Sequence, residues 1–195
     1  MAEGKSEQKH VAQFSMIVAA DDKMGIGVGL KLPWTLPGDR KYYLNHVNKV
    51  SPNKKLAIII GRKTQSVSTQ ESSPHKLIFV LSSTLKEVPH GADYVCRSLD
   101  EALAILEGPD LRDIVENIWL VGGYGVYKQG LESSKCHRYY ITRVYGDFNC
   151  NAFCPDVDTS IFQLISDPSI NSEIQEENGI KFRFEVYERI KGKDS

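Results

Sequence analysis

The feature that most constrains the fold of this chain is a series of short apolar runs separated by segments with helical spacing. The runs at residues 56–60 and 77–81 are continuously apolar, as expected for strands covered on both faces. Further strand-like runs lie at residues 14–20, 94–96, 118–121 and 138–144. Helical patterns lie at residues 39–50 and 98–106, and a third is expected after Gly125. This alternation predicts a parallel sheet with helices on both faces.

The C-terminal part follows a different pattern. From Phe182 to Tyr187, apolar and polar side chains alternate, which predicts an antiparallel strand added to the sheet. The sequence contains no internal repeat and no convincing linker. We therefore predict a single α/β domain over residues 14–190, with flexible tails at residues 1–13 and 191–195.

Composition excludes several classes of protein. Lys plus Arg number 24 against 25 Asp plus Glu, so the chain lacks the basic excess of a nucleic-acid or membrane-surface binder. The longest clean apolar run, residues 56–60, is far shorter than the roughly 18 residues of a transmembrane helix. The four cysteines form no CxxC pair, and no histidine lies near the one close pair, Cys150 and Cys154, which favours reduced thiols over a metal site. We expect a cytoplasmic monomer without metal.

Groups suited to anion binding follow four of the predicted strands. Taken singly, each of these segments is ordinary loop or helix-cap chemistry. Because parallel strands end at the same edge of a sheet, together they favour a phosphate-rich ligand. The four segments are Gly61-Arg62-Lys63-Thr64, Ser82-Ser83-Thr84, Arg97-Ser98 and Gly122-Gly123-Tyr124-Gly125.

The charges in these segments indicate which phosphate-rich ligand to expect. Gly122-Gly123-x-Gly125 lacks the spacing of the Rossmann fingerprint, and no acid follows about 20 residues later to bind a ribose 2′-hydroxyl. Arg62, Lys63 and Arg97 instead supply positive charge for a 2′-phosphate. The pattern predicts NADPH rather than NADH as the cofactor.

Asp39 has two interpretations. It precedes Tyr43 by four positions, so the two share one face of the predicted helix. An acid in a first turn commonly points outward and stabilises the helix dipole by about 0.3–1 kcal/mol. On the inward face, the same carboxylate would be a buried group that needs a cationic or hydrogen-bonding ligand.

Several motifs, in order along the chain, resemble dihydrofolate reductases. They are Ile17-Val18-Ala19-Ala20, Met24-Gly25-Ile26-Gly27, Leu32-Pro33-Trp34, Ile60-Gly61-Arg62-Lys63-Thr64, Val121-Gly122-Gly123 with Val126-Tyr127, Ile141-Thr142-Arg143, and the ending from Phe182 to Tyr187. The resemblance implies a three-layer α/β/α fold with a mostly parallel sheet of about eight strands. It also implies reduction of 7,8-dihydrofolate to tetrahydrofolate with NADPH, for one-carbon metabolism and thymidylate synthesis, and binding of antifolate inhibitors.

The resemblance also implies residue roles. The catalytic residues would be Asp39, Trp34, Leu32 and Thr142, with Asp39 holding the pterin 2-amino group and N3, and Thr142 bonded to Asp39. The substrate would be lined by Ile17, Val18, Ala19, Asp39, Tyr42, Tyr43, Val67, Lys76, Val121, Tyr127 and Thr142. The cofactor would be held by Ala19, Gly25, Ile26, Gly27, Gly61, Arg62, Lys63, Thr64, Leu81, Ser82, Ser83, Arg97, Val121, Gly122, Gly123, Tyr124, Gly125 and Val126. The segment from Met24 to Lys31 would close over the nicotinamide.

One departure affects the substrate tail. The arginine that clamps the glutamate carboxylate in the family falls on Lys76, and a single ammonium should hold that carboxylate less firmly than a bidentate guanidinium. Two alternatives therefore remain beside an active dihydrofolate reductase. One is a related pterin or pyrimidine reductase on the same fold, and the other is a folate- or NADPH-binding protein with little turnover.

Overall fold

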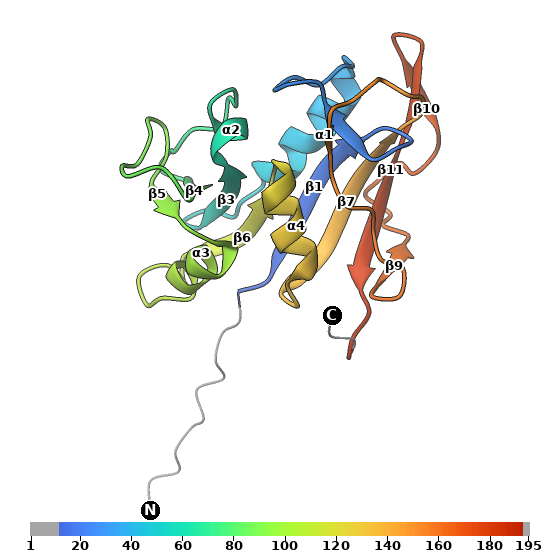
Figure 1. Ribbon diagram of the computed structural model, residues 1–195. Coiled ribbons are helices and arrows are strands. Elements are labelled where there is room, and N and C mark those ends of the chain that lie inside the picture. The colour runs from blue at the N-terminus through green and yellow to red at the C-terminus, as the bar shows by residue number, and fades with distance from the viewer. Residues whose placement is uncertain (1–11, 193–195) are drawn as a thin grey trace, which may run out of the picture.

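The apolar runs form the strands of one sheet in the computed structural model, which describes residues 12–192 (Figure 1). The predicted parallel strands are β1 (Phe14–Ala20), β3 (Lys55–Gly61), β4 (Lys76–Leu81), β5 (Tyr94–Cys96), β6 (Val115–Leu120) and β7 (Cys136–Val144). The sheet order is β10-β11-β7-β1-β6-β3-β4-β5, and every neighbouring pair from β7 to β5 is parallel. The predicted parallel sheet is confirmed.

Antiparallel strands complete one side of the sheet. The strand β11 (Ile180–Arg189) pairs antiparallel with β7, as the alternation near the C-terminus predicted. Two strands that the sequence did not reveal, β9 (Phe162–Ile165) and β10 (Gln175–Glu177), pair with β11. The sheet therefore has nine strands in the described part of the chain.

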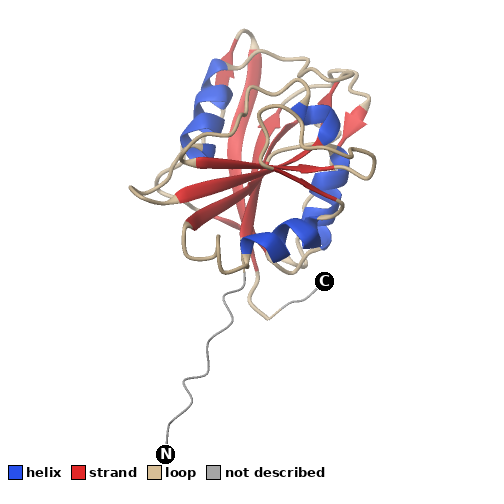
Figure 2. Ribbon diagram, turned by 90° about the vertical axis from the view of Figure 1, so that its left-hand side faces the viewer, coloured by secondary structure: helices blue, strands red, loops and turns tan. Residues whose placement is uncertain are grey.

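Helices cover both faces of the sheet, which gives the expected three layers (Figure 2). Successive residues of β3 alternate between the faces, with Ile59 in one apolar cluster and Ile58 in the other. The first cluster includes residues of α3 (Leu99–Leu106) and α4 (Tyr124–Glu132), and the second includes residues of α1 (Pro37–Val47). A short helix, α2 (Arg62–Gln65), follows β3 directly.

Two predicted boundaries are wrong. The first helix begins at Pro37 rather than at residue 39, because proline at a first helical position loses no hydrogen bond, and it ends at Val47 rather than at residue 50. Ala12 falls within the predicted tail, yet it is buried, and its amide donates to Glu107 Oε1 at 3.0 Å. Residues 1–11 and 193–195 of the predicted tails lie outside the described residues.

A second, small sheet joins two loops that are distant in sequence. In it, β2 (Gly25–Gly27) pairs antiparallel with β8 (Ala152–Phe153). This pairing holds the Gly-rich segment after β1 close to the segment after β7. Within residues 12–192, no helix has the length and apolar character needed to cross a membrane.

Candidate active site

Asp39 lies in the first turn of α1, with its carboxylate directed at the sheet. Pro37 begins the helix, and the N-cap residue Leu36 is buried, so the position of this turn is fixed. The hydroxyl of Thr142, on β7, donates to Asp39 Oδ1 at 2.7 Å, and Thr142 is only 1% exposed. The hydrogen bond expected from the resemblance is present. The carboxylate faces inward, as the second interpretation requires.

The surroundings of Asp39 favour its protonated form. Burial is the largest influence and raises the pKa of Asp39, while the hydrogen bond from Thr142 opposes the rise by stabilising the carboxylate. The negative charge of Glu177 raises the pKa further. A carboxyl group with a raised pKa, inside a site, is suited to holding N–H donors and to exchanging a proton.

Two tyrosines lie beside Asp39 and carry no charge at neutral pH. The Tyr127 hydroxyl donates to the carbonyl of Ile17 at 2.8 Å, and burial raises the pKa of Tyr127 well above its usual value. Burial also raises the pKa of Tyr43 to about 12, opposed by a hydrogen bond with Gln70. Tyr127 interacts electrostatically with both Asp39 and Tyr43, so the three side chains lie near one another. Beside the charge of Glu177, Asp39 therefore has these two neutral tyrosines near it.

Trp34 presents a donor that the described residues leave unused. Its side chain is buried and packs edge-on against Phe148, with ring centroids 5.2 Å apart. The indole Nε1 is buried and has no hydrogen-bond partner among the described residues. A buried donor of this kind needs an acceptor from water or ligand. Leu32, two positions earlier, is 55% exposed.

Two of the predicted substrate residues, Tyr42 and Val18, have side chains buried in the core. The ring of Tyr42 stacks on Phe184 of β11, with centroids 3.9 Å apart, and so packs between the helix and the sheet. Val18 packs into the cluster under α3 and α4, whereas its neighbours Ile17 and Ala19 face α1. Sequence spacing alone did not distinguish Tyr42 from Tyr43, because both positions are aromatic.

Lys76 lies at the start of β4 and already has protein partners. Its ammonium donates to Asn48 Oδ1 at 2.7 Å and to Gln70 Oε1 at 2.8 Å, and burial lowers its pKa. Gln70 is buried, while Val67, earlier in the same loop, is 53% exposed. Two of the three donors of Lys76 are therefore engaged by neutral oxygens.

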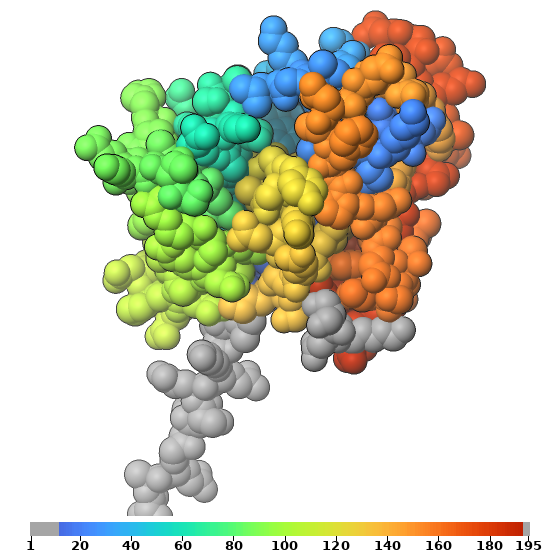
Figure 3. Space-filling model, in the orientation of Figure 1, coloured from blue at the N-terminus to red at the C-terminus, as the bar shows by residue number. Residues whose placement is uncertain are grey.

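The ends of β3 and β6 meet in a close glycine contact. The Gly61 amide donates to the Gly122 carbonyl at 2.9 Å. Gly122 and Gly123 have φ values of 144° and 73°, which disfavour other residues, and a Cβ at Gly122 would lie 3.1 Å from Thr64 Cγ2. Neither glycine carries a Cβ that would keep a ligand from the backbone just before α4. Figure 3 shows the surface recessed between α2 (teal) and α4 (yellow).

Positive side chains lie along the same edge of the sheet. Arg62 and Lys63 are exposed on α2, and Arg97, after β5, is exposed with one guanidinium nitrogen donating to the carbonyl of Ser82 at 2.7 Å. The Ser82 hydroxyl accepts from the amides of the following turn, while Ser83 is exposed. The three cations, which we call the cation edge, are placed as the sequence predicted.

Other predicted cofactor residues lie near the ends of β4 and β6, in α4 and in β2. Val121 and Leu81 are the buried residues where β6 and β4 end, and Val126 is buried inside α4. Tyr124 and Gly125 are exposed in the first turn of that helix. Ile26 lies between the two glycines of β2 and is partly buried.

Sequence reasoning missed the residues that hold the segment after β1. Asp21 is buried, and its carboxylate accepts from the amides of Gly25 at 2.7 Å and Phe148 at 3.3 Å. The backbone amide of Asn151 donates to the Gly27 carbonyl at 3.0 Å, and the side-chain Oδ1 of Asn151 accepts from the Gly29 amide at 2.8 Å. A lone acid and a lone asparagine give no sequence signal of the contacts with Phe148 and Gly29, because these partners are distant in the chain.

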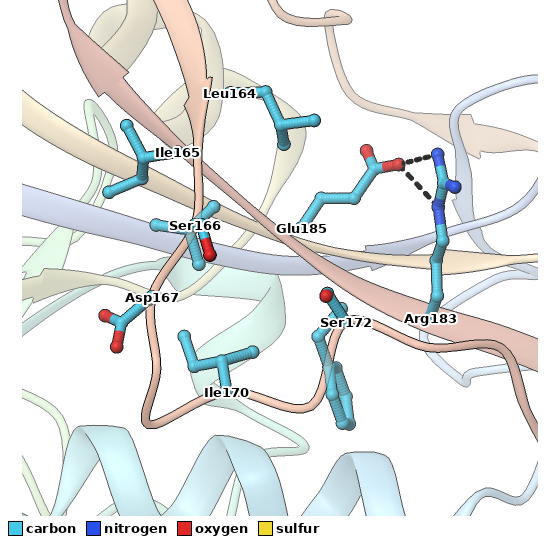
Figure 4. Close-up of a pocket in the computed structure, with 10 residues that line it drawn as sticks. Leu164, Ile165, Ser166, Asp167, Ile170, Ser172, Arg183 and Glu185 are labelled. Atoms are coloured by element: carbon cyan, nitrogen blue, oxygen red, sulfur yellow. Dashed lines mark hydrogen bonds and ion pairs between the residues drawn. The ribbon is translucent and has the colours of Figure 1, made fainter.

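A separate cavity of about 300 Å³ lies between β9, β11 and the segment that joins β9 to β10 (Figure 4). None of the residues assigned to the site at Asp39 lines this cavity. Its charged residues Arg183 and Glu185 are bonded to each other, and Glu185 also accepts from Arg143 at 2.9 Å. The third charged residue of the lining, Asp167, accepts from the Ser169 hydroxyl and pairs with Arg138, so all three charged side chains have protein partners.

Comparison with known proteins agrees with this geometry. The model of a family described as dihydrofolate reductase matches residues 13–189. Dihydrofolate reductases of Gallus gallus and Sus scrofa are 38% and 39% identical to the chain, over 92% of it and 97% and 99% of their own lengths. The solved structure of Schistosoma mansoni dihydrofolate reductase has a TM-score of 0.78 at 30% identity and covers 92% of this chain and 99% of its own.

These matches favour the first of the three interpretations over a different reductase or a binding protein with little turnover. The chain belongs to the dihydrofolate reductase family, and its activity is the NADPH-dependent reduction of dihydrofolate.

Proposed function

We propose that Asp39 is the carboxylate that binds the pterin ring of 7,8-dihydrofolate and promotes its protonation. The observation that carries this proposal is the 2.7 Å hydrogen bond from the buried Thr142 hydroxyl, which fixes Asp39 on the inward face of α1. An amino group and a ring N–H of the pterin are donors, and a carboxylate accepts from both. No other ionisable residue among those placed around the pterin is negatively charged at neutral pH.

The role of Asp39 in proton transfer follows from its raised pKa. Dihydropterin N5 is a weak base, so reduction at C6 needs a proton delivered nearby. A negative charge held beside the ring stabilises the protonated ring, and the neutral walls formed by Tyr43 and Tyr127 do not screen it as water would. The unused Nε1 donor of Trp34 fits a water molecule held at this end of the site.

The residues at the edge of the sheet fit NADPH. When bound, this cofactor supplies the hydride that reduces C6. The absence of a Cβ at Gly122 and Gly123 would allow close approach of a pyrophosphate to the backbone, and any Cβ at Gly122 would crowd Thr64. Arg62, Lys63 and Arg97 would hold the 2′-phosphate.

The tail of the substrate would extend from Tyr43 toward Lys76. The Gln70 side chain bonds to both residues, so it links the pterin end of the site to this cation. With two donors already engaged, Lys76 can offer one donor to a carboxylate. We infer a weak contact with the glutamate tail.

The proposal is tested by a single-turnover assay with each substrate in turn. Enzyme with NADPH is mixed with dihydrofolate, and the loss of cofactor absorbance is followed. Turnover with dihydrofolate, and much slower turnover with a non-folate pterin, is the expected result. Binding without absorbance change, or equal rates for both substrates, would contradict it.

We further propose that the enzyme acts as a monomer in the cytoplasm and does not bind nucleic acid. In support, all the residues assigned to the site come from one chain, the net charge is −1, and all four cysteines are free. Light scattering during size-exclusion chromatography tests the oligomeric state, and a mass of twice 21.9 kDa would contradict it.

A further inference from the structure

The turn between β10 and β11 contacts the helix end that carries Asp39. Both carboxylate oxygens of Glu177 accept from the Gly38 amide, at 2.9 and 3.1 Å. Its neighbour Asn178 donates its side-chain amide to the Thr35 carbonyl at 2.9 Å. Two successive residues of this turn therefore hold the backbone on either side of Pro37, just before Asp39.

The residue at position 38 makes this contact possible. A Cβ on Gly38 would overlap Glu177 Oε1. The constraint on Gly38 comes from this close approach and not from its backbone conformation, since Gly38 is not among the residues with positive φ. A side chain larger than that of glycine at position 38 would therefore displace the Glu177 carboxylate.

Glu177 also brings a second carboxylate close to the first. The titratable groups that act on Asp39 are Glu177 from the β10–β11 turn, Tyr42 from its own helix and Tyr127 from α4. Burial raises the pKa of both tyrosines, so they are neutral at neutral pH. From β7, the group that faces Asp39 is the Thr142 hydroxyl, which does not titrate. Glu177 therefore provides the charge that acts on Asp39.

We propose that Glu177 is a positioning residue for dihydrofolate reduction, which orients Asp39 through Gly38 and holds a negative charge beside it. This inference rests on the proposed role of Asp39. The charge of Glu177 favours a proton on Asp39 and, equally, a proton on the bound pterin. Both effects have the same sign: removal of the charge weakens proton binding at the reacting site.

The test compares four variants by stopped-flow hydride transfer across pH: Glu177→Gln, Gly38→Ala, Glu176→Gln and Asp39→Asn. Glu177→Gln keeps an acceptor for the Gly38 amide and removes the charge. We expect the apparent pKa of the rate to fall by about 0.5–1 unit. Above that pKa, the rate should then be lower by about three- to tenfold, with an unchanged plateau at low pH. Gly38→Ala, which displaces Glu177, should shift the profile in the same direction and also lower the plateau.

Glu176→Gln is the matched control. It removes the same charge one position earlier, from an exposed side chain, and should leave the profile unchanged. A Glu177→Gln profile that superimposes on that of Glu176→Gln overturns the inference. If Asp39→Asn slows hydride transfer and Glu177→Gln has no effect, only the inference fails. If Asp39→Asn itself has no effect, the proposed role of Asp39 fails first.

Discussion

The pterin end of the site and the cation edge use charge in opposite ways. At the pterin end, Asp39 is one partly buried carboxyl held by a buried hydroxyl and bordered by neutral tyrosines. At the cation edge, Arg62, Lys63 and Arg97 are exposed and surrounded by solvent. The surroundings at the pterin end change the protonation of Asp39. At the cation edge, three cations each add a solvent-screened attraction for an anion.

This difference leads to different responses to mutation and to salt. Loss of one cation removes part of the attraction for a phosphate, whereas loss of the Asp39 charge removes a function that no neighbour replaces. Salt should weaken binding at the cation edge more than at the pterin end, because exposed charges are screened more strongly.

Apart from loss of the Asp39 charge itself, the largest effect is expected when two cations of the cation edge are removed together. Arg62→Ala combined with Arg97→Ala should lower kcat/KM for NADPH by about 100-fold, since each charge-assisted contact contributes about 1.5–3 kcal/mol before screening. The value for NADH should change by less than about threefold, because NADH lacks the 2′-phosphate. Steady-state kinetics with both cofactors, at low and high salt, provides the measurement.

Arg112→Ala serves as the control for that double variant, since it removes an exposed cation paired only loosely with Asp113, at 3.7 Å. Equal losses of kcat/KM for NADPH and NADH in the double variant would show that the cation edge does not bind the 2′-phosphate.

A smaller effect is expected at the pterin end when the hydroxyl beside Asp39 is removed. Thr142→Val keeps the shape and removes the hydrogen bond, so the pKa of Asp39 should rise further. Dihydrofolate should bind about tenfold more weakly, because the carboxylate loses a charge-assisted bond and its fixed orientation. Fluorescence titration gives the affinity, and a pH series gives the direction of the shift. A downward shift of the rate profile would show that Thr142 does not act on the carboxylate.

The smallest effect is expected at Lys76, the first residue of β4. Lys76→Arg should lower the KM for dihydrofolate by about threefold, since a guanidinium can bond to Gln70 and still offer a bidentate pair to the tail. A tail-free diaminopyrimidine inhibitor should bind with unchanged affinity. An unchanged KM for dihydrofolate would mean that another cation holds the glutamate carboxylate.

Features that depend on residues close together in the chain could be predicted from the sequence. The apolar runs predicted the parallel strands, and the spacing from Asp39 to Tyr43 placed both on one helix face. Contacts between distant segments were not predictable: β2 with β8, Glu177 with Gly38, and Lys76 with Asn48. Tyr42 shows the limit of pattern reasoning, because its packing on Phe184 depends on where the last long strand lies.

The central claim is that the charge of Asp39 promotes protonation of the substrate, and Asp39→Asn tests it most directly. The variant keeps the shape and an acceptor for Thr142 but has no negative charge. Stopped-flow hydride transfer at pH 7 should slow by roughly 10²–10⁴-fold, the usual range for loss of acid–base assistance, and should recover in part at acidic pH. An outward acid at a helix end would instead contribute a few tenths of a kcal/mol to stability and nothing to turnover. A near-normal rate at pH 7 would contradict the account.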